Sequence, residues 1–278
     1  MSWIVWLKKF QMSPIVTIPK VIEVLPTPII TKPEEPKITS IPESANLAAR
    51  LLQADQDVKD VDVILTKHIV CNGKKVPIVW DKVVLWTDKG GLGYDKNCYD
   101  ERTFRQPTMF VAHWDVCLST SSMVKVTKER GLSVHFGIDN DGTIYQMLDT
   151  KNIAWHAKGA NTVSVGVEIC NGVALKYNDY YVKKGFGLRA IIQTEKVHGK
   201  EIGPYLDYYP AQIEAFKALT RALNLAHAIP LEAPMKNGLL LKEVSPEVVK
   251  NTFKGVVGHY NITASKIDPG CLPLDVIV

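Results

Sequence analysis

The sequence predicts a fold of the α/β or α+β class, in which short strands and helices are mixed along the chain. Residues 163–169 are β-branched and alternate, as a strand does, whereas residues 210–226 carry apolar side chains at helical spacing. The chain has 278 residues, 46% of them hydrophobic and 22% charged, so it can bury one large core or two modest ones. We therefore expect most of it to fold.

The N-terminal part of the chain is rich in proline. Seven prolines between residues 13 and 42 are interleaved with Val, Ile and Thr, which excludes a continuous helix or a central strand there. We expect an extended arm followed by a short helix at 44–55. Residues 1–58 would form either a linker or, because they are rich in Ile and Val, a segment that binds a partner protein. The globular domain would then span 59–278.

Strand composition and turn residues predict most of the globular part. Asn72-Gly73 and Asn140-Asp141-Gly142 are hairpin turns between stretches of strand composition. The apolar strand 109–112 leads directly into His113, and Glu168 lies near the end of 163–169. The expected strands are 61–70, 75–86, 109–112, 133–138, 143–148, 163–169 and 256–257.

Two further helices are expected in the C-terminal half. Pro210 suits the first turn of the 210–226 helix, which should cover one face of the sheet. Ser245-Pro246-Glu247 starts a short helix, and we expect Gly255 to end it before the strand at 256–257. The segment 176–209 lies between the strand that carries Glu168 and the 210–226 helix. It is long enough to be an insertion that shapes a groove.

Charge, cysteine content and hydropathy exclude several classes of protein. Thirty-three basic and 29 acidic residues give a net charge of only +4, so we expect no nucleic-acid partner. The five cysteines are scattered without a C-x-x-C pair, which argues against a disulfide framework. No apolar stretch reaches the roughly 20 residues of a transmembrane helix, and the N-terminus is a poor signal peptide.

The run Gly258–Gly270, with the sequence GHYNITASKIDPG, carries the most informative polar residues. It places His259, Lys266 and Asp268 within ten residues, just after the apolar Val256-Val257. An imidazole and a carboxylate at a strand end are typical metal ligands, but one segment supplies only part of a zinc shell. The sequence therefore predicts a metal site that needs a further ligand from elsewhere in the chain.

Three histidines lie near predicted strand ends, namely His113, His156 and His259. Each of them could be a hydrogen-bonded structural residue instead of a ligand. Because His113 and His259 follow apolar strands directly or nearly so, their two strand ends can converge on one metal. No H-E-x-x-H helix is present, which excludes the thermolysin type of zinc site.

Five blocks of sequence, in the same order over about 160 residues, together resemble one known family. The blocks are FVAHW (110–114), SVHFGIDNDGTIYQ (133–146), AWHAK (154–158), SVGVEI (164–169) and GH-(x6)-K-x-D-P-G (258–270). The family is that of the zinc-dependent N-acetylmuramoyl-L-alanine amidases, which includes phage endolysins, cell-wall recycling amidases and peptidoglycan recognition proteins. The resemblance does not extend to the N-terminal arm.

The resemblance implies a central mixed β-sheet flanked by helices, with one Zn²⁺ ion per chain at the strand ends. The implied ligands are His113, His259 and Asp268, with water in the fourth position. Some relatives have Cys where this chain has Asp268, but Cys271 lies three residues further on and does not align.

The resemblance also implies roles for residues around the metal. Glu168 would act as general base and acid, and Lys266 would stabilise the oxyanion. His135, His156 and Lys158 would line the substrate groove, although packing of His156 on the sheet is an alternative. Several phage relatives have a catalytic tyrosine near His135, which this chain lacks, so more of the catalysis would fall to Glu168.

These residues together indicate a zinc hydrolase that cuts the amide bond between N-acetylmuramic acid and L-alanine in bacterial peptidoglycan. We expect a phage-encoded enzyme, either an endolysin or a virion-associated protein, synthesised in the host cytoplasm and acting at the bacterial cell wall. Two alternatives stay open: a binding module that grips peptidoglycan without cutting it, and a phage structural protein that carries the amidase domain on the virion. In the latter, the arm would bind other virion proteins.

Overall fold

A six-stranded mixed sheet forms the centre of the structure, which is a computed structural model describing residues 67–277. The strand order is β16-β5-β9-β6-β7-β3. Neighbouring strands run parallel throughout, except for the antiparallel pair β6 and β7. The strands are β3 (Val83–Leu85), β5 (Met109–Trp114), β6 (Phe136–Ile138), β7 (Ile144–Gln146), β9 (Ser164–Ile169) and β16 (Gly255–Gly258).

Both expected hairpins are present. β1 (His68–Cys71) and β2 (Lys74–Pro77) pair around Asn72-Gly73, whose φ angles of 52° and 74° suit this turn. β6 and β7 pair around the turn at Gly142, which has a φ of 81°. The expected strand 75–86 is divided in the structure, because β2 belongs to the hairpin and β3 to the central sheet. The arm, the helix at 44–55 and the start of the first strand lie outside the described residues.

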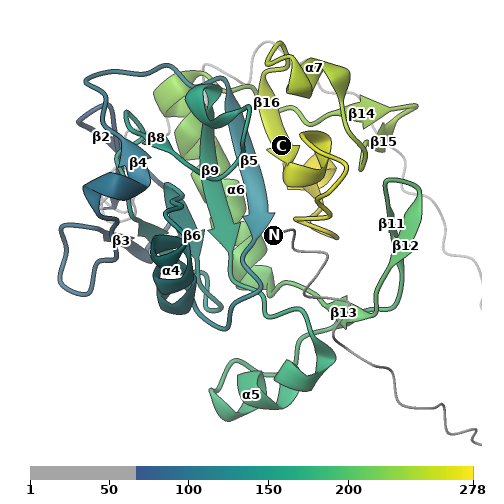
Figure 1. The fold of residues 1–278 in the computed structure, drawn as a ribbon. Helices are drawn as coiled ribbons and strands as arrows, with labels where there is room; N and C mark the ends of the chain where they lie inside the picture. The colour runs from purple at the N-terminus through teal and green to yellow at the C-terminus, as the bar shows by residue number, and fades with distance from the viewer. Residues whose placement is uncertain (1–66, 278) are drawn as a thin grey trace, which may run out of the picture. The chain divides into compact units, whose positions relative to one another are not determined.

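Helices cover both faces of the central sheet. The expected helix is α6 (Pro210–His227), which lies behind β5 and β9 in Figure 1 and stacks Phe216 on Phe110 with 5.2 Å between ring centroids. On the opposite face, α4 (Thr120–Glu129) packs over β6. A Cβ on Gly137 of β6 would lie 2.4 Å from Thr120, so the close approach of α4 requires glycine there. The expected flanked mixed sheet is confirmed.

The sheet has one apolar face and one chemically mixed face, because side chains alternate along each strand. Phe110 and Ala112 of β5 join the large core under α6, together with Val165 and Val167 of β9. The alternate residues of the same two strands, among them His113 and Glu168, point away from α6. The polar side chains thus gather on the face that α6 does not cover.

The remaining helices are short. α7 (Pro246–Val249) is the helix expected after Ser245, whose side chain accepts a hydrogen bond from Val248 N. The expectation that Gly255 ends this helix is wrong: the helix ends at Val249, and Gly255, with a φ of 142°, is the first residue of β16. The others are α5 (Asn178–Lys183), α8 (Leu274–Ile277) and the 3-10 turns η1 (Lys96–Cys98), η2 (Asn161–Val163), η3 (Leu175–Tyr177) and η4 (His259–Asn261).

The segment 176–209 contributes α5 and several short strands beside the central sheet. Its hairpin of β11 (Glu195–Val197) and β12 (Lys200–Ile202) turns at His198-Gly199. Within residues 67–277, no helix is both long and apolar enough to cross a bilayer. The other two-stranded ladders are β4 (Tyr99–Asp100) with β8 (Ile153–Ala154), β10 (Ile191–Ile192) with β13 (Tyr205–Leu206) and β14 (Met235–Lys236) with β15 (Leu239–Leu240).

A buried histidine at the end of α6 makes the fold sensitive to acid. His227 is 3% exposed, and its Nε2 lies 2.8 Å from Thr150 Oγ1. Burial, reinforced by the nearby charge of Arg105, lowers the pKa of His227 from 6.5 to about 4. The unfolded chain therefore takes up a proton at this residue before the folded chain does, so stability is lost as the pH falls from 6.5 towards 4.

We expect a His227→Gln variant to lose less stability on acidification than the wild type. Because the pKa of His227 is lowered in the folded protein, acidification from about pH 7 to pH 4.5 reduces the free energy of unfolding by about 2.5 kcal/mol through this residue alone. Urea unfolding of both proteins at each pH, with a chelator present, measures the difference. Carboxylates titrate in both proteins and cancel in the comparison. Equal losses in the two proteins would show that His227 is not an acid-sensitive group.

Candidate active site

The register of three parallel strands brings the candidate site residues to one edge of the sheet. His113 lies beside Glu168 in the pairing of β5 with β9. Gly258, the last residue of β16, lies beside Ala112, so His259 emerges next to His113. These residues are far apart in the sequence, and the common direction of the strands places them together.

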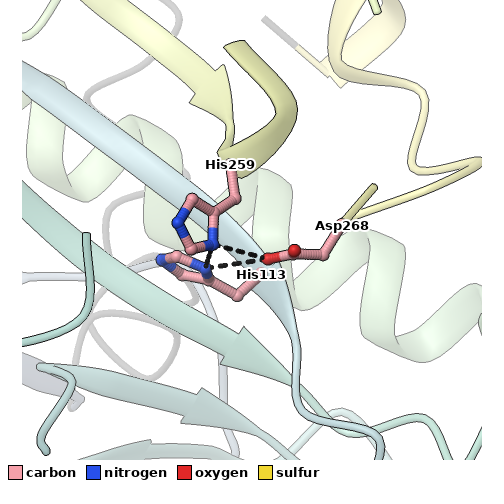
Figure 2. A group of neighbouring side chains, drawn as sticks. All are labelled: His113, His259 and Asp268. Atoms are coloured by element: carbon pink, nitrogen blue, oxygen red, sulfur yellow. Dashed lines mark hydrogen bonds and ion pairs between the residues drawn. The ribbon is translucent and has the colours of Figure 1, made fainter. Parts of the chain in front are cut away.

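His113, His259 and Asp268 form a compact, buried group of possible metal ligands (Figure 2). The Nδ1 atoms of the two histidines are 3.0 Å apart, and each lies 3.0 Å from Asp268 Oδ2. Each of the three residues is at most 7% exposed. Among residues 67–277, no other group of three His, Cys, Asp or Glu side chains is close enough to share a metal.

The shape of this group fits a zinc ion. With zinc-to-ligand bonds of about 2.0–2.1 Å in a tetrahedron, neighbouring ligand atoms are about 3.3 Å apart. The three observed separations are within a few tenths of an ångström of that value. Two imidazole nitrogens and one carboxylate oxygen are also a donor set that zinc uses in catalytic sites, where the fourth position stays open.

The loop after η4 positions Asp268. The backbone carbonyl of Asp268 accepts a hydrogen bond from Tyr260 N at 3.0 Å, and the next carbonyl, of Pro269, accepts one from Tyr208 Oη at 2.8 Å. A Cβ on Gly258 would lie 2.5 Å from the Tyr260 ring and 2.8 Å from Pro269 Cδ. Glycine at 258 is therefore needed for the loop to return to the strand end.

The electrostatics of the group favour the protonation states that bind metal. Burial, with the adjacent His259, lowers the pKa of His113 to about 4. Burial alone would raise the pKa of Asp268, but the two histidines more than offset it, so the pKa of this carboxyl lies below its usual range. A neutral His113 and an ionised Asp268 are the forms in which these side chains act as ligands.

Glu168 is the carboxylate on the neighbouring strand. Its Oε2 is buried and has no hydrogen-bond partner among the described residues. Burial raises the pKa of Glu168 well above its ordinary value, and the charges of Asp115 and Asp268 raise it further. The positive charges of Lys266 and Arg130 act in the opposite direction. Such a buried carboxyl next to a possible metal site is suited to proton transfer.

Lys266 is half-buried and lies close enough for its charge to act on both Glu168 and His113. The 176–209 segment holds its backbone: His198, at the turn of the β11–β12 hairpin, donates through Nε2 to the Lys266 carbonyl at 2.8 Å. The hairpin is tied in turn to Lys242, whose carbonyl accepts from His198 N at 2.9 Å. This segment therefore supports the loop that carries Lys266.

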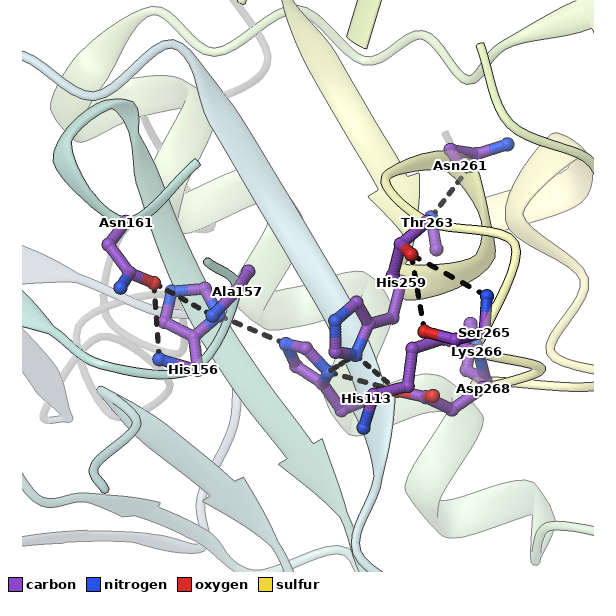
Figure 3. A network of polar contacts seen from close by, with 12 residues as sticks. His113, His156, Ala157, Asn161, His259, Asn261, Thr263, Ser265, Lys266 and Asp268 are labelled. Atoms are coloured by element: carbon purple, nitrogen blue, oxygen red, sulfur yellow. Dashed lines mark hydrogen bonds and ion pairs between the residues drawn. The ribbon is translucent and has the colours of Figure 1, made fainter. Parts of the chain in front are cut away.

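The three residues expected to line a substrate groove occupy three different environments. Lys158 is exposed. His156 is partly buried and hydrogen-bonded to His113, with 3.0 Å between His156 Nδ1 and His113 Nε2 (Figure 3). His135 is completely buried, and its Nδ1 accepts a hydrogen bond from Gly166 N at 3.1 Å. This placement makes His135 a support for β9, away from any substrate surface.

Two buried groups that support the site escape the sequence analysis. Asp115 accepts hydrogen bonds through Oδ1 from Cys117 N and Asn171 N, so it ties together the chain after β5 and the chain after β9. Arg105 lies against His135 Nε2 and donates to backbone carbonyls that include the Ser164 carbonyl. The position of Asp115, two residues after the strand-end His113, could have indicated a role near the site. No comparable sequence feature marks Arg105.

Cys271 is not part of the metal group. Its Sγ lies 3.1 Å from Asp207 Oδ1, in a contact separate from the two histidines. Asp268, three residues earlier, is the residue that groups with the two histidines, as its place in the Lys-x-Asp-Pro-Gly run implies.

A buried group of two histidines and an aspartate, with a proton-transfer carboxyl beside it at the ends of parallel strands, is typical of a metallohydrolase with a single ion. Residues 103–271, more than half of the chain, match the family model described as N-acetylmuramoyl-L-alanine amidase. The chain therefore belongs to the N-acetylmuramoyl-L-alanine amidase family, and it is an enzyme of that class.

Solved structures include similar chains at low sequence identity. The endolysin amidase LysCS from Clostridium intestinale is 19% identical, with 70% of this chain and 92% of that chain covered and a TM-score of 0.40. A mutant Bacillus subtilis endolysin is 16% identical, with 71% and 97% covered and a TM-score of 0.40. AmiD from E. coli, solved with anhydro-N-acetylmuramic acid-L-Ala-D-gamma-Glu-L-Lys, is 18% identical, with 66% of each chain covered and a TM-score of 0.39. Among curated proteins, no significant match is found.

We expect an Asp268→Ala variant to lose high-affinity zinc binding, whereas Cys271→Ser keeps it. Removal of the carboxylate leaves two nitrogen ligands, which hold zinc more weakly than three. Metal analysis after gel filtration measures the zinc content of each protein. Thermal unfolding gives a second readout, because added zinc raises the Tm of any variant that binds it in the folded state. If Cys271→Ser lost zinc and Asp268→Ala retained it, Cys271 and not Asp268 would be the third ligand.

Proposed function

We propose that this chain is a zinc-dependent amidase that hydrolyses the bond between the lactyl group of N-acetylmuramic acid and L-alanine in bacterial peptidoglycan. The observation that carries the proposal is the buried triangle of His113, His259 and Asp268 with Glu168 on the adjacent strand. This arrangement lies within the residues that match the amidase family model. Family membership supports the proposed reaction, and the triangle supports these residues as its site.

In this proposal, one Zn²⁺ ion per chain would be held by His113, His259 and Asp268. When bound, zinc supplies Lewis acidity, which lowers the pKa of a water molecule and polarises a carbonyl group. The three ligands come from β5, from the turn after β16 and from the following loop, so the site forms only when these elements are packed together.

Glu168 moves the proton in the proposed reaction. Its carboxylate accepts a proton from the attacking water as the water oxygen bonds to the amide carbonyl carbon. It then delivers that proton to the alanine nitrogen as the carbon–nitrogen bond breaks. The raised pKa of Glu168 supports the second step, because a carboxyl that holds its proton more tightly is a competent acid near neutral pH. A cation beside Asp268 offsets one of the charges that raise this pKa, which favours the first step.

Lys266 stabilises negative charge in the proposed transition state. Its ammonium group is carried by a loop held through the carbonyl contact with His198. A fixed positive charge beside the carbonyl oxygen stabilises the oxyanion of the tetrahedral intermediate. The exposed Lys158 is proposed to contact carboxylates of the stem peptide at the edge of the site.

We expect a Glu168→Gln variant to keep its zinc and to lose activity by about 10²- to 10⁴-fold, which is the usual contribution of a general acid–base group. The amide is nearly isosteric with the carboxylate but cannot accept the proton. Release of muramyl-linked peptide from purified cell wall, followed by mass spectrometry, measures the activity. Glu129→Gln, on an exposed position of α4, is the matched control and should be fully active. An active Glu168→Gln protein with wild-type zinc content would exclude this role.

We expect a Lys266→Met variant to lower kcat by about 10²- to 10³-fold, as removal of an oxyanion-stabilising group does, while KM changes little. The methionine keeps much of the side-chain length and removes the charge. Steady-state kinetics on a soluble muropeptide separate the two constants, because an interaction made only in the transition state affects kcat. Lys254→Met removes an exposed lysine near β16 and serves as control. A rise in KM alone would assign Lys266 to substrate binding.

The same cell-wall digestion separates the amidase from a binding-only module, since the latter would hold stoichiometric zinc and release no product. A phage origin is part of the proposal, with the bacterial cell wall as the place of action. Whether the enzyme is a free endolysin or is carried on the virion depends on residues 1–58, which lie outside the described residues. Detection of the protein in purified phage particles would favour the virion, and its absence from them would favour the free enzyme.

A further inference from the structure

His156 connects the candidate metal ligand His113 to the interior of the protein (Figure 3). Its Nδ1 lies 3.0 Å from His113 Nε2, and the two rings meet edge to face at 86°. On the other side of the ring, His156 Nε2 lies 3.3 Å from Ser164 Oγ. Ser164 Oγ in turn donates to the Ala160 carbonyl at 2.8 Å. Three side chains therefore form one continuous line of hydrogen bonds that starts at a metal ligand.

The protons along this line have one consistent arrangement. The nitrogen of His113 that faces His259 and Asp268 is Nδ1, so this nitrogen must carry a lone pair to bind a metal, and the ring proton must be on Nε2. His113 Nε2 then donates to His156 Nδ1. This places the proton of the neutral His156 ring on Nε2, from which it is donated to Ser164 Oγ.

The far end of the line accepts this arrangement without a conflict. Ser164 Oγ can accept from His156 and still donate its own hydrogen to the Ala160 carbonyl. In the opposite arrangement, a proton on His156 Nδ1 would point at His113 and require a lone pair on His113 Nε2. The proton of His113 would then lie on Nδ1, the nitrogen needed for the metal.

The backbone around His156 is built to hold the ring in this place. Gly166 of β9 lies under the ring, and a Cβ there would be 2.6 Å from the His156 Nδ1 and Cε1 atoms. Asn161 Oδ1 accepts hydrogen bonds from His156 N at 3.2 Å and Ala157 N at 2.7 Å, which fixes the turn that carries the histidine. Gly166 and Asn161 thus both help to hold the His156 ring against β9.

We propose that His156 and Ser164 are positioning residues that fix the tautomer and the orientation of His113, with Nδ1 turned toward the metal. This inference rests on the proposed function, because it assumes that His113 binds zinc. It assigns His156 to the support of the metal centre and removes it from the substrate-contact set. A hydrogen-bond partner on the second nitrogen of a ligating histidine typically changes metal affinity or activity by about 10- to 100-fold.

The test is the zinc affinity of His156→Ala and His156→Asn, measured by competition with a chromogenic chelator. We expect the alanine variant to bind zinc about 10- to 100-fold more weakly. The asparagine variant should recover much of this loss, because its side-chain oxygen lies close to the position of the imidazole Nδ1 and can accept from His113. Ser164→Ala should give a smaller loss in the same direction.

His68→Ala, which removes an imidazole from β1, is the matched control and should bind zinc like the wild type. Thermal unfolding of the metal-free proteins shows whether each variant is folded. Wild-type zinc affinity in a folded His156→Ala protein would overturn the inference, as would equal losses in the alanine and asparagine variants.

The outcome for the wild type separates the two proposals. If the wild type binds no zinc, the proposed function itself fails. If the wild type binds zinc and releases product while His156→Ala binds equally well, the amidase proposal stands and the positioning role alone is excluded.

Discussion

The parallel pairing of β16, β5 and β9 is the constraint on which the rest of the site depends. It places His259 next to His113 and His113 next to Glu168, although 146 residues separate the two histidines. A shift of one residue in either pairing would move a site residue to the apolar face under α6. The core on that face, which includes Phe110 stacked on Phe216, therefore fixes the register that the chemistry needs.

The sheet is packed closely on both faces because small residues lie at selected positions. Gly137 allows α4 to approach β6, Gly166 allows the His156 ring to lie on β9, and Gly258 allows the Asp268 loop to fold back on β16. In each case an added Cβ would come within 2.6 Å of a neighbouring atom. Since protein interiors are packed at the density of organic crystals, none of these contacts could be relieved without moving a site element.

The sequence predicts the local features of this protein well. Hairpin residues such as Asn72-Gly73, the helical spacing of 210–226 and the apolar strand before His113 depend on neighbours in the chain, and each is found in the structure. The helix α4 was missed because only three of its ten residues, Met123, Val124 and Val126, are apolar. A helix or strand can therefore be predicted only where its own residues carry a clear pattern.

Contacts between distant segments could not be predicted in the same way. The sequence motifs selected His113, His259 and Asp268, and the structure brings them together. The same motifs gave His156 and His135 a place in the substrate groove, since a motif marks a residue without naming its neighbours. His156 instead contacts His113 across 43 residues, and His135 lies in the interior beside Arg105. Only the packed sheet shows which neighbours each of these histidines contacts.

The two carboxylates of the site show how packing gives two acidic residues different electrostatic environments. Asp268 and Glu168 are both removed from water, which by itself raises the pKa of each. Asp268 lies 3.0 Å from two imidazole nitrogens, and these interactions lower its pKa enough to keep it ionised and ready to bind a cation. Glu168 Oε2 has no hydrogen-bond partner among the described residues and faces the negative charges of Asp115 and Asp268, so its pKa is raised. Environments that drive two carboxyl pKa values apart suit the two groups to different protonation states, and here the difference follows from where each carboxyl lies. Glu168 is near the end of β9, whereas Asp268 is in the loop after η4, within reach of two histidines.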